Sequence, residues 1–209
     1  MVTHLILVLG YDKHSSASVQ VLQDTIQSAN FGIDHFDEHF AIKKAHGASQ
    51  VFDAILEAES ILHVTGHAND RGQLASQHQQ PWGQRLFAVS DFAKYLKATN
   101  QSIQPDLIIL DACLTASDTW LNNLENCLPP DHRTLVIATN RAVPTGISNY
   151  FTQTFYHSLF SKPYPESRAK RRVRIEQAFN VADHTTLQIT QQHSFFNLVG
   201  LRGYDSPAC

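Results

Sequence analysis

An unbroken run of four apolar residues, 107–110, followed at once by Asp111-Ala112-Cys113, constrains the fold of this chain more than any other stretch. Such a run is typical of a central strand that is covered on both faces, as in a parallel sheet. A carboxylate and a thiol then follow at the carboxyl end of the strand, the edge of open α/β sheets where ligands bind. The sequence therefore predicts a buried parallel sheet with chemistry at this edge.

A second segment of the same design lies upstream at residues 61–68, and it delivers Gly66 and His67 just past a buried strand. If the two strands are neighbours, His67 and Cys113 face each other across one crevice. A thiolate is the reactive form of cysteine, and a nearby imidazole can take the thiol proton and return it to a leaving group. The pair is therefore a candidate for nucleophilic catalysis.

Strand-like and helix-like segments alternate along the rest of the chain, which predicts a three-layer α/β sandwich with a mostly parallel central sheet. No repeat or linker interrupts the pattern, so we expect a single domain over residues 1–209. Residues 69–83 read as a long surface loop beside the predicted site. Further strands are predicted at residues 5–9, 33–40, 135–139 and 196–201, and helices from 15, over 48–59, around 89–96, and over 117–128, 147–160 and 175–182.

The composition excludes several classes of function. A formal net charge of −3 and a pI near 6.4 give no reason to expect nucleic acid or an anionic membrane as partner. The basic run at residues 167–174 is interpreted as a solvated helix start. The N-terminus lacks the features of a signal peptide, and three cysteines are too few and too uneven for a disulfide framework. We therefore expect a cytoplasmic protein with free thiols.

Other cysteines and histidines have ordinary interpretations. Cys127 lies on the apolar side of a predicted helix and is assigned to the core, and Cys209 is a terminal thiol. His63 alternates with core positions and is expected to be buried and hydrogen-bonded. His63 and His67 could share a strand face, but no third ligand stands at a recognisable spacing, so neither zinc nor another cofactor is expected.

A strand ending in Thr65-Gly66-His67, then a strand ending in Asp111-Ala112-Cys113, resembles the caspase-like cysteine peptidases, a clan that includes caspases, metacaspases, legumains, separases and the bacterial CHAT domains. His67 lies 46 residues before Cys113, close to the offset of roughly 50 residues in caspases. Residues 155–159 and 178–182 are similar to the paired helices that close a CHAT domain. The resemblance covers about residues 3–203.

The resemblance implies a cysteine endopeptidase in which Cys113 is the nucleophile and His67 the general base or acid. It also implies an oxyanion hole made by the backbone N–H groups of Cys113 and of the residue after the histidine. That residue is Ala68, where the family usually has glycine. A left-handed backbone at Ala68 would cost about 1–2 kcal/mol and reduce activity.

The resemblance further implies specificity for a basic residue before the cleaved bond, because Asp111 stands two positions before the nucleophile, as in metacaspases. Asp12 is a candidate second carboxylate of the same pocket. Arg141 falls where caspases carry a pocket arginine, and we expect it to bind substrate backbone or to pair with a carboxylate. Arg171-Arg172, if exposed, could be a site of self-cleavage.

Residues 114–133 do not resemble the cleavable linker of caspases, so we expect regulation by a separate protein partner or by exposure of the substrate. By analogy with bacterial caspase-like proteins, a defence or programmed-death module is a candidate setting.

Two alternative functions stay open: a pseudoenzyme that binds peptide or protein without cutting it, and a flavodoxin-like or Rossmann-like ligand-binding domain. The second is disfavoured because residues 9–12 lack a Gly-rich phosphate loop.

Overall fold

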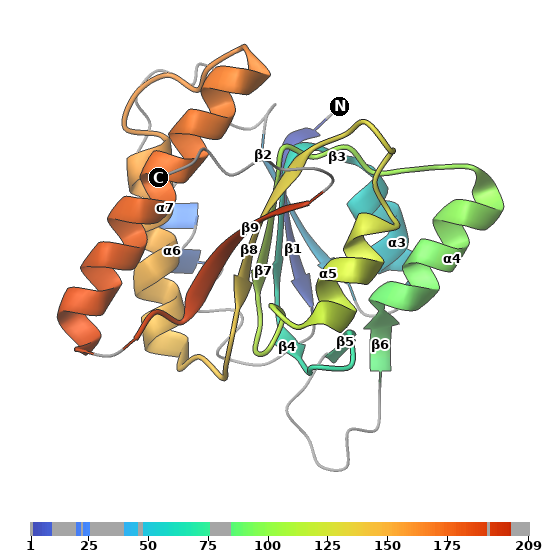
Figure 1. The fold of residues 1–209 in the computed structure, drawn as a ribbon, viewed down its shortest axis with the longest axis horizontal. Coiled ribbons are helices and arrows are strands. Elements are labelled where there is room, and N and C mark those ends of the chain that lie inside the picture. The colour runs from blue at the N-terminus through green and yellow to red at the C-terminus, as the bar shows by residue number, and fades with distance from the viewer. Residues whose placement is uncertain are drawn as a thin grey trace.

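A six-stranded sheet with the order β2-β1-β3-β7-β8-β9 forms the centre of the molecule (Figure 1). The computed structural model describes residues 2–9, 20–21, 23–25, 40–45, 48–75, 85–191 and 193–201. The strands of the main sheet are β1 (Val2–Leu9), β2 (Phe40–Ala45), β3 (Ala58–Thr65), β7 (Leu107–Asp111), β8 (Thr134–Thr139) and β9 (Phe196–Leu201). The helices are α3 (Ala48–Leu56), α4 (Val89–Thr99), α5 (Asp118–Glu125), α6 (Thr145–Leu159) and α7 (Arg168–Thr190).

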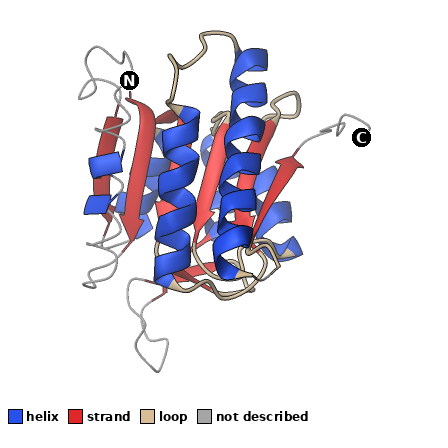
Figure 2. Cartoon of the chain, turned by 90° about the vertical axis from the view of Figure 1, so that its left-hand side faces the viewer, coloured by secondary structure: helices blue, strands red, loops and turns tan. Residues whose placement is uncertain are grey.

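Helices cover the sheet on both faces. α6 and α7 lie side by side against one face (Figure 2), and α3, α4 and α5 lie on the other (Figure 1). Within the main sheet, the five strands β2, β1, β3, β7 and β8 run parallel to one another, and β9 is antiparallel to β8. The predicted three-layer α/β sandwich with a mostly parallel sheet is confirmed.

The apolar run of β7 is buried on both faces, which explains why it has no polar break. Ile108 and Leu110 pack in the cluster beneath α3, α4 and α5, whereas Leu107 and Ile109 pack in the cluster beneath α6 and α7. All four side chains are buried. The alternation determines on which face of the sheet each side chain of β7 lies.

Three segments differ from the sequence-based expectation. The helix predicted over 48–59 ends at Leu56, and β3 begins at Ala58 because Ala58 pairs with Val2 of β1. Tertiary pairing here overrides helix propensity. Strand β2 begins at Phe40, whereas the predicted strand was 33–40; residues 33–39 lie outside the described part. The predicted loop at 69–83 contains a strand, because β4 (His67–Ala68), β5 (Gln73–Ala75) and β6 (Arg85–Ala88) form a small antiparallel sheet.

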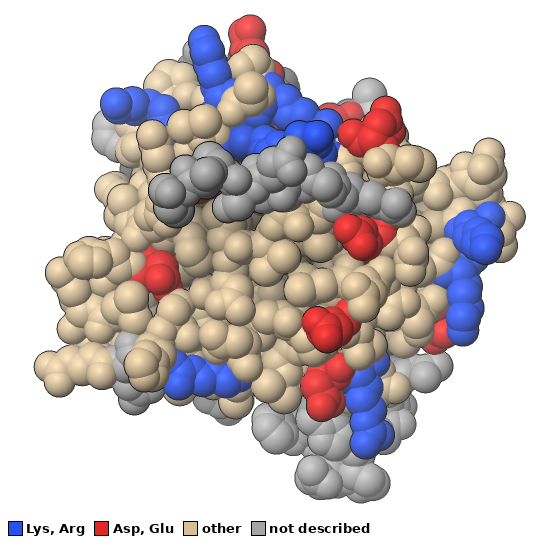
Figure 3. Space-filling view, viewed as in Figure 1, with Lys and Arg blue, Asp and Glu red and all other residues tan. Residues whose placement is uncertain are grey.

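The start of α7 is fixed to the amino end of β7 by a buried carboxylate. Asp106 is 5% exposed and accepts from Arg168 Nε at 2.8 Å and from Arg171 Nε at 2.6 Å. Basic side chains gather over this end of the molecule (Figure 3). The interpretation of this run as merely solvated is therefore wrong for these two arginines. The Arg171-Arg172 bond lies inside α7, which does not fit the extended form that a peptidase cleaves.

None of the described helices is both long and apolar enough to span a bilayer.

Candidate active site

Strands β3 and β7 are neighbours, and their pairing places the predicted dyad. The last register pair is Thr65 with Asp111, in a parallel ladder. Gly66 then donates its N–H to the Asp111 carbonyl at 3.3 Å. His67 and Cys113 each follow that pair by two residues, so they leave the same edge of the sheet at the same level. Both are partly exposed.

Two buried threonines hold the turn that carries Cys113. The Thr115 hydroxyl oxygen lies 3.2 Å from the Leu110 carbonyl oxygen and 3.1 Å from the Ala112 carbonyl oxygen, and it can donate a hydrogen bond to either. Thr139 at the end of β8 donates to the Ala112 carbonyl as well, and its own N–H donates to Thr115 Oγ1 at 3.0 Å. The backbone on both sides of the thiol is therefore fixed by the sheet.

Leu114, directly after the thiol, has a left-handed backbone with φ of 59°. This conformation costs a residue with a Cβ about 1–2 kcal/mol. The N–H of Leu114 donates to the Arg141 carbonyl at 3.4 Å, and the Leu114 side chain is exposed. Strain of this kind persists where the surroundings impose it, and it clusters at active sites. The sharp turn exposes Cys113 at the sheet edge.

The segment after His67 is a tight hairpin that requires glycine. Gly72 has a φ of 74°, and a Cβ there would lie 2.9 Å from a methyl group of Val89. The Gly72 carbonyl accepts the Val89 N–H at 2.9 Å, which joins the hairpin to the start of α4. Asn69 Oδ1 accepts from the backbone N–H groups of Arg71 and Gln73 and closes the turn.

Two side chains at the start of α5 donate hydrogen bonds to the same hairpin. Trp120 Nε1 donates to the Asn69 carbonyl at 2.7 Å, and Ser117 Oγ donates to the Asp70 carbonyl at 3.1 Å. Trp120 is buried. Because α5 begins five residues after Cys113, these bonds connect the histidine segment to the cysteine segment independently of the main sheet.

Ala68 has an extended backbone, since it belongs to β4 and is absent from the described non-glycine residues of positive φ. The expected left-handed strain does not arise there. Asn69 donates its N–H to the Gln73 carbonyl at 3.1 Å, one step beyond the last register pair, so the pair of Ala68 and Leu74 is a non-hydrogen-bonded one. The Ala68 N–H therefore points away from β5 and makes no ladder bond to it.

Asp111 lies beneath this edge rather than on the surface. Its side chain is 9% exposed, it accepts a hydrogen bond from Ser148 Oγ of α6, and its Oδ2 lies 3.8 Å from His63 Nε2. The predicted burial and hydrogen bonding of His63 are confirmed, because the ring is fully buried and its Nδ1 lies 2.9 Å from Tyr156 Oη. Asp12, the other predicted pocket carboxylate, lies outside the described residues.

Arg141 is held by its own chain. Its Nη2 donates to the carbonyl oxygens of His193 and Ser194, and its guanidinium stacks on the Phe195 ring at 4.0 Å. In the described part of the chain no carboxylate pairs with it, and the expected ion pair stays a prediction. A role in binding substrate backbone stays a prediction.

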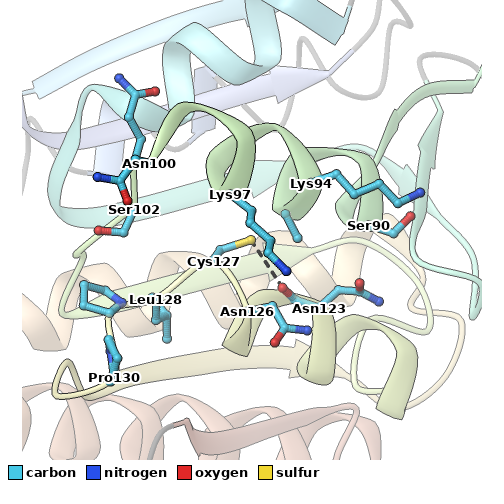
Figure 4. A pocket seen from close by; sticks show the side chains of 13 residues that line it. Ser90, Lys94, Lys97, Asn100, Ser102, Asn123, Asn126, Cys127, Leu128 and Pro130 are labelled. Carbon is cyan, nitrogen blue, oxygen red and sulfur yellow. Dashed lines mark hydrogen bonds between the residues drawn. The ribbon is translucent and has the colours of Figure 1, made fainter.

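A cavity of about 590 Å³ lies between α4 and α5, apart from the predicted dyad (Figure 4). Lys94 and Lys97 come from α4, and Asn123 and Asn126 from α5 and its C-terminus. Cys127 also lines it, and burial raises the pKa of this thiol to about 12. The assignment of Cys127 to the core is confirmed, since it is 1% exposed.

Sequence reasoning missed the side chains that hold the site together: Asn69, Thr115, Trp120, Thr139 and Ser148. The Asn69-x-x-Gly72 spacing is a turn signal that could have indicated the hairpin. The other four contact groups far away in sequence, so no local pattern marks them.

Comparisons with known proteins agree with the fold. No family model and no curated protein matches the sequence. The structure is similar to a secreted C11 cysteine protease from Bacteroides thetaiotaomicron in complex with an irreversible peptide inhibitor (TM-score 0.54, 14% identity, 88% of this chain and 60% of that chain). It is also similar to the Arg-specific cysteine proteinase gingipain R (TM-score 0.57, 11% identity, 90% and 43%).

A third similar structure is the complex of the pro- and mature domains of Porphyromonas gingivalis RgpB (TM-score 0.55, 12% identity, 90% of this chain and 44% of that chain). This chain thus spans less than two thirds of the length of each neighbour. The likeness establishes the fold, which is that of the caspase-like cysteine peptidases indicated by the two motifs. The cytoplasmic location stays a prediction.

Proposed function

We propose that this chain is a cysteine endopeptidase in which Cys113 is the nucleophile and His67 is the general base and acid. The observation that carries the proposal is the register of β3 and β7, which brings both residues to one level at the carboxyl edge of the sheet. The cysteine-protease neighbours support the same chemistry.

The reaction would proceed through a thioester. His67 takes the thiol proton, and the sulfur of Cys113 attacks the carbonyl carbon of the peptide bond. The N–H groups of Cys113 and Ala68 stabilise the oxyanion. The C–N bond breaks, and His67 returns the proton to the leaving amine. Water, activated by His67, then attacks the thioester; the carboxylic acid leaves and the thiol is restored.

We propose that Asp111 directs cleavage to the bond after Arg or Lys. A partly desolvated carboxylate attracts a cation and repels an acidic side chain. At an effective dielectric of about 20, a unit pair at 4 Å is worth about 4 kcal/mol before desolvation is subtracted. One of the similar structures is of an Arg-specific proteinase, which supports the same preference. Ser148 uses only part of the accepting capacity of the carboxylate.

A separate protein partner, or exposure of the substrate, would control the activity. One of the similar structures is a complex of the pro- and mature domains of RgpB. It supports the idea that a bound polypeptide can regulate a protein of this fold. A place in a bacterial defence or death module rests on analogy with bacterial caspase-like proteins. Low activity of the purified chain on folded proteins, together with activity on short peptides, is the expected result.

The pseudoenzyme alternative had Ala68 as its only sequence support, and the extended backbone of Ala68 removes that reason. A panel of fluorogenic peptides that differ only in the residue before the reporter tests the proposal. Wild type should release the fluorophore from Arg and Lys peptides, and Cys113→Ala should not. Equal rates for wild type and Cys113→Ala would reject the proposed activity. A preference of wild type for Asp peptides would reject the proposed specificity.

A further inference from the structure

Four side chains form a buried chain beneath the end of β7. Ser148 of α6 donates to Asp111 Oδ1, and Oδ2 of the same carboxylate faces Nε2 of His63 at 3.8 Å. On the far side of the imidazole, Nδ1 lies 2.9 Å from Tyr156 Oη of α6. Ser148, His63 and Tyr156 are all buried, which isolates the carboxylate from competing water.

The direction of the hydrogen atoms follows from Asp111 on one side of the imidazole together with Tyr156 on the other. Burial above all, with contributions from Asp111 and Tyr164, raises the pKa of Tyr156 well above 10. Its hydroxyl therefore keeps its proton and can donate to His63 Nδ1. A neutral imidazole that accepts at Nδ1 carries its hydrogen on Nε2. That N–H is directed toward the carboxylate, whereas the other tautomer would set a nitrogen lone pair against it.

The contact from His63 to Asp111 is too long to be a hydrogen bond. Within the described residues, Nε2 of His63 has no hydrogen-bond partner. The Tyr156 ring lies nearly parallel to the imidazole, with centroids 5.7 Å apart, and limits its movement. The carboxylate is thus oriented by Ser148 and flanked by a positive N–H edge, yet it is not paired with any cation in the described part of the chain.

Resting on the peptidase function proposed above, we propose that Ser148, His63 and Tyr156 are positioning residues. They hold the Asp111 carboxylate as a receptor for the guanidinium of a substrate arginine, and thereby set the preference for a cationic over a neutral side chain. Ser148 holds one oxygen by a hydrogen bond, and the buried His63–Tyr156 pair lies beside the other oxygen and limits its movement. The substrate cation would supply the charged partner that Asp111 lacks among the described residues.

A merely structural role makes a different prediction. If Ser148 only attaches α6 to the sheet, its loss should slow every substrate to the same degree. If it positions Asp111, its loss should affect arginine peptides and spare citrulline peptides, because citrulline has nearly the shape of arginine without the charge. The Arg-to-citrulline ratio of kcat/KM is therefore the readout.

The experiment compares Ser148→Ala with Ser148→Thr, which restores the hydroxyl, and with Ser158→Ala as a matched control on the same helix. We expect Ser148→Ala to lower the ratio at least about tenfold, chiefly through KM for the Arg peptide. Ser148→Thr should recover most of it, Ser158→Ala should leave it unchanged, and Tyr156→Phe should lower it less than Ser148→Ala. An unchanged ratio in Ser148→Ala, or an equal loss on both peptides, would overturn the inference.

Binding measured without turnover separates this inference from the proposed activity. In the Cys113→Ala protein, titration calorimetry compares an Arg peptide with its citrulline analogue, with and without Ser148→Ala. Loss of an Arg preference on adding Ser148→Ala supports the positioning role even if the wild type cleaves nothing, a result that would contradict the peptidase. Cleavage by wild type with equal affinity for both peptides, or an Arg preference that survives Ser148→Ala, contradicts the positioning role and leaves the peptidase standing.

Discussion

Gly66 donates its backbone N–H to the carbonyl oxygen of Asp111 across 3.3 Å. This bond extends the ladder of β3 and β7 past its last register pair, at the point where both strands turn away from the sheet. Backbone pairing therefore sets the relative position of the two segments that carry His67 and Cys113. A second tie, from Trp120 of α5 to Asn69, fixes the same two segments from the other side.

Replacing Ala68 tests the oxyanion hole. Ala68→Pro removes the N–H at a position that makes no ladder bond to β5, and it should lower kcat by about 100- to 1,000-fold. The extended backbone at Ala68 can accept proline, so the protein should fold. Ala68→Gly keeps the N–H and should change kcat by no more than a few-fold. Steady-state kinetics on an Arg peptide measure both; similar losses in the two variants would exclude this donor.

Asp106→Asn tests the buried ion pair at the opposite end of β7. The change leaves Arg168 and Arg171 without their carboxylate, and the free energy of unfolding should fall by about 3 kcal/mol. Glu57→Gln, which breaks an exposed pair with Lys43, should cost no more than about 0.5 kcal/mol. Urea unfolding compares the two. An Asp106→Asn protein as stable as Glu57→Gln would show that this pair does not anchor α7.

His132 gives the stability a predictable dependence on pH. Burial lowers the pKa of His132 below its ordinary 6.5, and Arg168 lowers it further. The Pro105 carbonyl, Asp106 and Asp131 act in the opposite direction. As the pH falls below about 6.5, the unfolded chain takes up a proton that the folded chain refuses, so the free energy of unfolding decreases.

The variant His132→Gln should therefore lose less stability than wild type between pH 7 and pH 5.5. Near pH 8, where the imidazole is neutral in both states, this linkage contributes nothing. His157→Gln, at an exposed position of α6, serves as control. Urea unfolding at each pH measures the slopes; an identical pH slope in His132→Gln and wild type would contradict the assignment.

The elements with a strong local pattern could be predicted from the sequence. The strand β7 is found where expected, because a strand buried on both faces consists of an unbroken run of apolar residues. The strand at residues 196–201 is also found where expected, although it is an edge strand and only partly buried. The sequence predicts a loop after His67 where the structure has a hairpin, since β5 has three residues and depends on pairing with β6. Strands this short carry no periodicity of their own.

The site was predictable only in part, and for a physical reason. Cys113 and His67 follow two strands with a strong apolar pattern, and the parallel pairing of these strands brings both residues to one edge. The partners of Asp111 come from another strand and from α6, and the anchoring of Arg171 depends on a carboxylate 65 residues away. Such long-range contacts arise from packing, which a single sequence does not reveal.

The measurement that tests the central claim most directly is covalent labelling of the native protein with an arginyl peptide acyloxymethyl ketone, located by peptide mass mapping in a Cys209→Ser background. We predict a single adduct on Cys113, formed at least about 100-fold more slowly in His67→Ala. Cys127 should stay unmodified, because burial raises its pKa to about 12. If Cys113 is labelled at a rate that depends neither on the peptide part of the reagent nor on His67, it is an ordinary thiol, and the proposed catalytic dyad is contradicted.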